Sequence, residues 1–139
     1  MTPKHNNDDF RTGLHLFNRA QFFDAHEALE NAWRSVPVNQ PLRRHLQGMV
    51  QLAVAFHHVS KGNCVGARSV LERAMRNLNG AEISFPDLDL VRLRADLAPW
   101  SRYLDHWGKA LNAPAPASDH PQNVPTTMAP KRPQIVPRS

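Results

Sequence analysis

The sequence predicts an all-α protein: a compact bundle of about five helices over residues 8–112, followed by a disordered proline-rich tail over residues 113–139. Apolar residues recur with helical periodicity in five successive segments, and no segment shows the alternation of a half-buried strand. Proline and glycine fall mainly between these segments. The composition then changes sharply, with seven of the 12 prolines in the tail. A length of 139 residues favours a single domain.

The first two helices are predicted from apolar stripes that cover one face of each. The first helix begins around Asn7 or Asp8, where the helix dipole favours acidic residues, and ends near Asn18. A short turn leads to the second helix, residues 22–35. Its apolar face carries Phe22, Leu29, Trp33 and, just beyond it, Val36. We expect the two apolar faces to share one core.

The third helix is predicted to be the central one. Pro41 suits the first turn of a helix, and this helix extends to about Ser60. Apolar residues surround most of its circumference, which is typical of a buried helix. The exception is a polar line of Gln47, Gln51 and His58, which lie within about 40° of one another. A glutamine among apolar residues needs a hydrogen-bonding partner, so this line should face another polar group.

Two further helices complete the predicted bundle. Gly62 and Asn63 are suited to end the third helix and cap the fourth, which extends from Cys64 to about Leu78. A fifth, more broken helical region covers residues 88–111, and Pro99 should kink or restart it. The tail that follows has almost no bulky apolar residues before Ile135, and we expect it to be passive rather than a peptide ligand for a partner.

Composition excludes several classes of protein. The net charge of +5 comes from arginines scattered along helices that also carry acids, so nucleic-acid binding is disfavoured. The single cysteine, Cys64, excludes an internal disulfide and a site with several thiolates in one chain. The N-terminus lacks an apolar stretch of signal-peptide length, and the longest apolar run is too short to span a bilayer. We expect a soluble, cytoplasmic protein without membrane contact.

One polar constellation could carry chemistry. On the second helix, His26 lies within the apolar stripe and Glu30 lies at its edge, where burial of polar groups is costly. If the second and third helices pack antiparallel, these side chains can meet Gln51 and His58. Two imidazoles and one carboxylate suit a single divalent metal such as zinc, iron or manganese, with His26, Glu30 and His58 as ligands and Gln51 behind them. Without a metal, Glu30 could fix the tautomer of His26 for acid/base catalysis.

The same residues equally fit a structural role. A histidine and a glutamate four residues apart, bonded to a buried glutamine, form a polar network that can fix the register of two helices. Trp33 is most simply a core residue, His57 also projects toward the core, and His45 is expected on a helix surface beside two arginines. The order of His26, Glu27 and Glu30 differs from the zinc-protease motif His-Glu-x-x-His, because a carboxylate replaces the second imidazole.

Several short motifs occur in a fixed order: Phe17-Asn18, then Phe23-x-x-His-Glu-x-x-Glu-x-x-Trp-Arg34, then Leu46-Gln-Gly-x-x-Gln-Leu-Ala53, then His58-x-x-x-Gly-Asn-x-x-Gly-Ala67. Over about residues 10–80 this pattern resembles a small prokaryotic family catalogued as domain of unknown function 309. The resemblance implies an all-helical fold and no established activity. It also implies a set of recurrent positions: His26, Glu27, Trp33, Glu30, Gln51, His58 and Asn63. Glu27 lies on the polar face, so we expect it to cap a neighbouring helix or face a partner subunit.

Two classes of function follow. The first is a polar pocket between the second and third helices, with hydrolytic or acid/base chemistry at His26 and Glu30. Its remaining lining would be Glu27, Trp33, Gln47, Gln51 and Asn63. The alternative is a non-catalytic interaction module or homo-oligomer, in which the same residues form a structural network. The pocket requires convergence around a cavity, whereas the module requires an exposed apolar patch and tolerates a closed network. Neither class names a small-molecule ligand.

Overall fold

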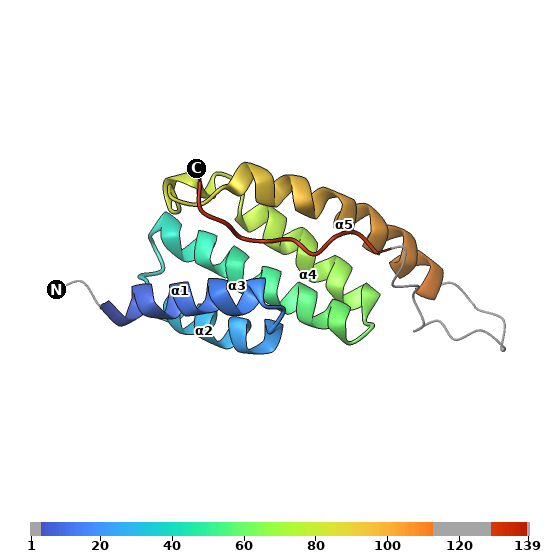
Figure 1. Ribbon diagram of the computed structural model, residues 1–139, viewed down its shortest axis with the longest axis horizontal. Coiled ribbons are helices and arrows are strands. Elements are labelled where there is room, and N and C mark those ends of the chain that lie inside the picture. Colours follow the sequence, from blue (N-terminus) through green and yellow to red (C-terminus); the bar gives the residue numbers. More distant parts are fainter. Residues whose placement is uncertain (1–3, 113–128, 139) are drawn as a thin grey trace.

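The computed structural model of the chain describes residues 4–112 and 129–138. Five α-helices and one short 3₁₀ helix follow one another, and within the described residues there is no strand, so the predicted all-α bundle is confirmed. The elements are α1 (Lys4–Asn18), α2 (Phe22–Arg34), α3 (Pro41–Ser60), α4 (Cys64–Asn77), η1 (Ala81–Ile83) and α5 (Leu90–Asn112). Successive helices are antiparallel (Figure 1), as short connections favour. The restart predicted at Pro99 does not occur, because α5 continues through this residue as one helix.

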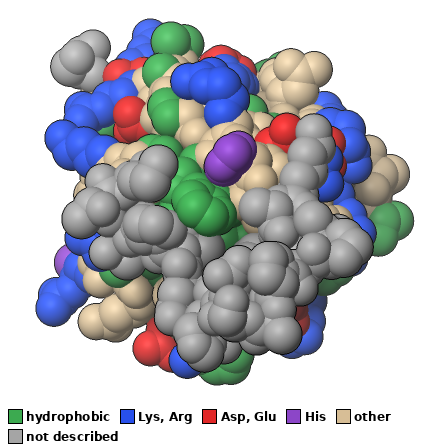
Figure 2. Space-filling view, turned by 90° about the vertical axis from the view of Figure 1, so that its right-hand side faces the viewer, with side chains coloured by type: hydrophobic (Ala, Val, Ile, Leu, Met, Phe, Trp, Pro, Cys, Tyr) green, Lys and Arg blue, Asp and Glu red, His purple; other side chains and the backbone are tan. Residues whose placement is uncertain are grey.

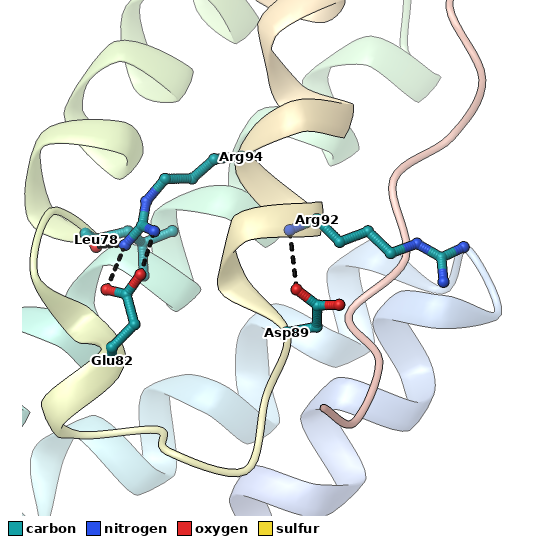
Figure 3. Close-up of polar contacts among 5 residues, drawn as sticks. All are labelled: Leu78, Glu82, Asp89, Arg92 and Arg94. Atoms are coloured by element: carbon teal, nitrogen blue, oxygen red, sulfur yellow. Dashed lines mark hydrogen bonds and ion pairs between the residues drawn. The ribbon is translucent and has the colours of Figure 1, made fainter. Parts of the chain in front are cut away.

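Capping residues fix several helix ends, and two of these residues, Gly62 and Asn63, were predicted from the sequence. The side chain of Asn63 caps α4 by accepting a hydrogen bond of 2.9 Å from the backbone N–H of Gly66. Gly62 adopts a positive φ of 74°, which ends α3 without the strain that a side chain would cause. Asp89 caps α5 in the same way as Asn63, through a bond of 3.0 Å from the N–H of Arg92 (Figure 3). Gly62 and Asn63 together set the short turn that keeps α3 and α4 antiparallel.

The core is centred on α3, as its nearly continuous apolar surface predicted. This helix packs against both α2 and α4. An aromatic cluster joins four helices at its far end: Phe56 of α3 contacts Phe17 of α1, Phe22 of α2 and Trp100 of α5, with ring centroids 6.0, 5.8 and 5.1 Å away. All four side chains are buried. Phe56 is therefore the point at which most of the bundle meets.

Gly48 allows α3 and α4 to approach closely. A Cβ atom at this position would lie 2.8 Å from Cγ of Leu78 and 3.2 Å from the carbonyl oxygen of Ala74. The first distance is shorter than real side chains permit, and the second involves backbone that cannot turn away. The absence of a side chain at Gly48 thus sets the spacing of these two helices.

An arginine clamp ties the start of α5 to the end of α4. Arg94 donates hydrogen bonds to the carbonyl oxygen of Leu78, at 2.9 Å, and to Oε1 of Glu82, at 2.8 Å (Figure 3). A further bond to the other carboxylate oxygen makes the pair bidentate. The hydrogen bonds from Arg94 lower the pKa of Glu82 from 4.5 to about 2. The clamp holds η1 and the loop before α5 in place.

The C-terminal residues depart from the predicted disordered tail. Residues 113–128 lie outside the described residues, but residues 129–138 lie along the bundle beside α5 and in the opposite direction (Figure 1). Ile135 is only 4% exposed, and Pro133 is fully buried. Residues 129–138 thus pack against the bundle, because α1 and α5, remote in sequence, provide the surface that buries Ile135.

None of the described helices combines the length and the apolar character that crossing a membrane requires.

Candidate functional site

The predicted pair on α2 forms and lies near the surface rather than inside the bundle. Nε2 of His26 is 3.0 Å from Oε2 of Glu30, and the two side chains are 26% and 27% exposed. The other oxygen of Glu30 pairs with Arg34, one further turn along the helix. Because a carboxylate accepts, the neutral imidazole carries its proton on Nε2. The result is a ladder of three residues along one helix, with Glu30 shared between two donors.

Aromatic rings flank this ladder. Phe23 is 52% exposed, although it lies in the first turn of a helix whose opposite face is deeply buried. Its ring centroid is 5.9 Å from that of His26 and 5.6 Å from that of His57 on α3. His57 is half-buried and is followed by His58, whose ring is 6.4 Å away. We call the surface formed by Phe23, His26, Glu30, His57 and His58 the Phe23 patch. His57 therefore contributes to a surface, not to the core where the sequence placed it.

The polar line on α3 finds its partners on the α4 side. Gln51 accepts a hydrogen bond of 2.7 Å from the side-chain amide of Asn77 at the end of α4. Asn63 donates to Nδ1 of His58 at 3.2 Å while it caps α4. Among the described residues, Gln51 and His58 therefore bond to α4 and its cap, and neither forms a hydrogen bond with the pair on α2. Helical periodicity gave the face of α3 that needed partners, but α3 lies between two helices, and the partners belong to α4.

The described residues contain no group of three His, Cys, Asp or Glu side chains that could hold a metal ion. His26 and Glu30 lie together, whereas His58 is bonded to Asn63. The residues as arranged do not fit a three-ligand metal centre. The zinc, iron or manganese site predicted at His26, Glu30 and His58 stays a prediction.

The other predicted pocket residues are dispersed. Glu27 is exposed on α2, and Gln47 is half-buried on α3. Trp33 packs under Arg43, whose guanidinium carbon is 4.2 Å from the ring centroid, a cation–π geometry. Within the described part of the chain, the buried Nε1 of Trp33 has no hydrogen-bond partner. Trp33 thus packs against Arg43, which also donates to the carbonyl oxygen of Val36 in the loop between α2 and α3.

His45 is the polar residue that sequence reasoning misplaced. It was expected on a helix surface, but it is only 2% exposed and its ring packs against Phe85. Nδ1 lies 2.5 Å from Oγ of Ser84, and a guanidinium nitrogen of Arg44 lies 3.4 Å from Nε2. The signal was present, because His45 precedes Met49 by four residues, on the same apolar stripe. The surface position was predicted because Arg43 and Arg44 directly precede His45.

The pair formed by His45 and Ser84 does not resemble an activated nucleophile. A guanidinium can only donate, so Nε2 of His45 accepts the hydrogen bond from Arg44. The proton of the neutral imidazole is then on Nδ1, which donates a hydrogen bond to Oγ of Ser84. A base that is to activate a serine must instead accept the hydroxyl proton. Ser84 borders a shallow pocket of about 350 Å³, lined also by Gln40, Pro41, Leu42 and Ile83. The pair is a buried structural contact at the floor of that pocket.

His45 should make the fold sensitive to acid. Burial and the neighbouring charge of Arg44 lower its pKa below 6.5, so the unfolded chain takes up a proton first as the pH falls. The free energy of unfolding should therefore decrease below about pH 6.5, by at most about 1.4 kcal/mol per pH unit for one group. We expect His45→Gln to reduce the difference in Tm between pH 7.5 and 5.5. His15→Gln, at an exposed position on α1, is the matched control. An unchanged difference in His45→Gln would contradict this assignment.

Part of the chain is similar to known proteins. The sequence model of the family described as "Domain of unknown function (DUF309)" matches residues 10–70, which contain every predicted site residue. The resemblance inferred from the motifs is therefore confirmed over this region. The chain is 33% identical over 69 residues to "Uncharacterized protein YpuF" of Bacillus subtilis (strain 168). This alignment covers 50% of the chain and 39% of that relative, so the chain spans less than half of the relative's length. No solved structure matches the chain.

Proposed function

We propose that this helical protein, whose residues 10–70 match the model of the DUF309 family, is a non-catalytic interaction module that pairs with a second copy of itself through the Phe23 patch. A cytoplasmic setting is part of this proposal. Within the described residues, the polar side chains that could have lined a catalytic pocket bond locally in separate groups. What they leave on the surface is an aromatic patch.

The exposure of Phe23 is the observation that carries the proposal. A phenylalanine that is 52% exposed, with imidazole rings of two helices around it, is typical of an interface core and not of an isolated surface residue. Aromatic side chains supply much of the binding energy of protein interfaces when a partner buries them. The half-exposed ladder of His26 and Glu30 would form the polar rim of the same contact.

The charges on α2 favour a second copy as the partner. Asp24 and Glu27 are exposed in the first half of this helix, and Arg34 is exposed at its end. A two-fold axis would set two α2 helices antiparallel, so that the acids of one copy face Arg34 of the other. Such a contact is self-complementary, as a two-fold interface requires. The charge pattern thus supports a second copy as the partner and an antiparallel orientation of the two α2 helices.

Sedimentation velocity tests this proposal. We expect a dimer for the wild-type chain and a monomer for Phe23→Ser, because the substitution removes the aromatic side chain that each copy contributes to the contact. Val38→Ser, which alters an exposed aliphatic residue outside the patch, should leave the dimer intact. Glu27→Arg should weaken association by placing like charges opposite each other, and adding Arg34→Glu should restore it. A wild-type chain that is monomeric at every concentration would overturn the proposal.

The hydrogen bond between His26 and Glu30 supports a second candidate, metal-free acid/base catalysis. Glu30 fixes the imidazole with Nδ1 as the accepting nitrogen, which a general base needs. The pairing of Glu30 with Arg34 counts against this candidate, because the carboxylate is already shared with a second donor. The metal content of the untagged protein tests the metal site that was predicted from the sequence. Near-stoichiometric zinc, iron or manganese, lost in a folded His26→Ala/His58→Ala variant, would favour the predicted metal site over both.

A further inference from the structure

The bundle holds the main chain of its C-terminal segment, residues 129–138, through an asparagine side chain. Nδ2 of Asn18 donates to the carbonyl oxygen of Ile135 at 2.8 Å, and Oδ1 of Asn18 accepts from the N–H of the same residue at 2.8 Å. Paired residues of adjacent antiparallel strands exchange the same two bonds. The side-chain amide of Asn18, at the end of α1, therefore bonds to Ile135 as a residue of a neighbouring strand would.

Further contacts extend this recognition along the segment. The N–H of Asp89 donates to the carbonyl oxygen of Val136 at 2.9 Å, and Arg138 donates to the carbonyl oxygen of Asp87 at 2.8 Å. Nε1 of Trp100 donates to the carbonyl oxygen of Lys131 at 2.8 Å. Main-chain contacts of this kind bind any extended peptide and supply affinity without selecting its sequence.

Two side chains supply the selectivity. Pro133 and Ile135 are both buried against the bundle, whereas Lys131 and Arg132 are exposed. Alternate residues of an extended chain point to the same side, so positions two apart enter the groove together. We therefore expect the groove to select peptides in which a proline is followed two residues later by an aliphatic residue.

We propose that this groove is a peptide-binding site for an extended Pro-x-aliphatic segment of another protein, and that residues 129–138 occupy it until such a segment displaces them. The bound segment defines the chemistry of that partner, since the groove bonds to its main chain and buries the side chains of Pro133 and Ile135, while the Gln134 side chain donates to the carbonyl oxygen of Asn18 at 3.2 Å. A tethered competitor acts at an effective concentration on the order of millimolar, which weakens but does not prevent binding in trans.

The groove is held in shape by the bundle itself. Asp89 caps α5, and Trp100 packs against Phe56 and Tyr103 within the core. The Arg94 clamp fixes η1 ahead of the loop that contains residues 87–89. Residues that are already ordered lose little entropy when a peptide binds, so the groove is preorganised for a ligand in trans.

Fluorescence anisotropy tests this site with the full chain and a labelled peptide of residues 129–138. In Ile135→Asp the internal segment should leave the groove, because a carboxylate cannot be buried there without a partner. We expect this variant to bind the peptide at least about tenfold more tightly than the wild-type chain, where the internal segment competes. A peptide that itself carries Ile135→Asp should not bind. Adding Asn18→Ala should weaken peptide binding at least about tenfold by removing two main-chain hydrogen bonds, whereas Asn31→Ala on α2 should not.

Three outcomes would overturn the proposal. One is the absence of peptide binding to an Ile135→Asp chain that keeps its helical circular dichroism. Another is loss of the fold in both Ile135→Asp and the milder Ile135→Ala, which would make the segment an integral part of the core. The third is a wild-type dimer that Ile135→Asp dissociates and Phe23→Ser does not, because the groove would then hold the segment of a second copy. The first two outcomes do not depend on the proposed α2 interface, and the third distinguishes that interface from the groove.

Discussion

Replacing Phe56 with alanine is expected to lower the free energy of unfolding by about 3–5 kcal/mol, the usual cost of removing a large aromatic side chain from a packed core. Phe56 is fully buried and its ring contacts Phe17, Phe22 and Trp100, which come from three other helices. The cavity left by the substitution would therefore open where α1, α2, α3 and α5 meet, and no single helix could shift to fill it.

Urea denaturation followed by circular dichroism measures this change, with the slope of the transition as a check that two-state unfolding is retained. Val38→Ala, at an exposed apolar position, should change the free energy of unfolding by no more than about 0.5 kcal/mol. Phe56→Leu should fall between the two variants because it leaves a smaller cavity. A loss below about 1 kcal/mol in Phe56→Ala would show that the aromatic cluster is not tightly packed.

Replacing Gly48 with valine is expected to destabilise the protein by about 1–3 kcal/mol, as overpacking of a core does. The new Cβ would meet Cγ of Leu78 at 2.8 Å and the carbonyl oxygen of Ala74 at 3.2 Å. The gain of about 1 kcal/mol or less from replacing glycine within a helix is too small to offset displacement of α4.

A double variant separates this steric cause from a general effect on α3. Leu78→Ala alone should destabilise the protein because it creates a cavity, but in the Gly48→Val background part of that cavity is filled. The two changes should therefore cost less together than the sum of the single variants, a coupling that thermal or urea unfolding detects. Additive losses would place the strain elsewhere. Glu72→Ala, at an exposed position of α4, should be nearly neutral.

The helices were predictable because their information is local. The apolar stripes and the capping residues Asn63 and Gly62 gave the order of the helices, and the apolar circumference of α3 gave its central position. The predicted pair of His26 and Glu30 also forms, since residues four apart on a helix are neighbours whatever surrounds them.

The remaining features depend on tertiary contacts that periodicity does not encode. A helical wheel gives the face on which Gln51 lies, but not that Asn77 of α4 faces it rather than the pair on α2. The proline content of residues 113–139 is typical of disorder, whereas the burial of Ile135 depends on α1 and α5. His45 could have been identified by its spacing from Met49, but its partner Ser84 lies in a distant loop.

The C-terminal segment also changes the connectivity of the bundle. Among the described residues the largest packing interfaces join helices that are consecutive in the sequence, from α1 with α2 to α4 with α5, and Phe56 adds contacts from α3 to α1 and to α5. Since none of these large interfaces joins α1 to α5, the helices form an open array with these two at its ends. The segment bonds to Asn18 at one end of that array and to Trp100 at the other. It thereby closes the array into a ring. Release of the segment would reopen the ring between α1 and α5 while every pair of consecutive helices kept its own contacts.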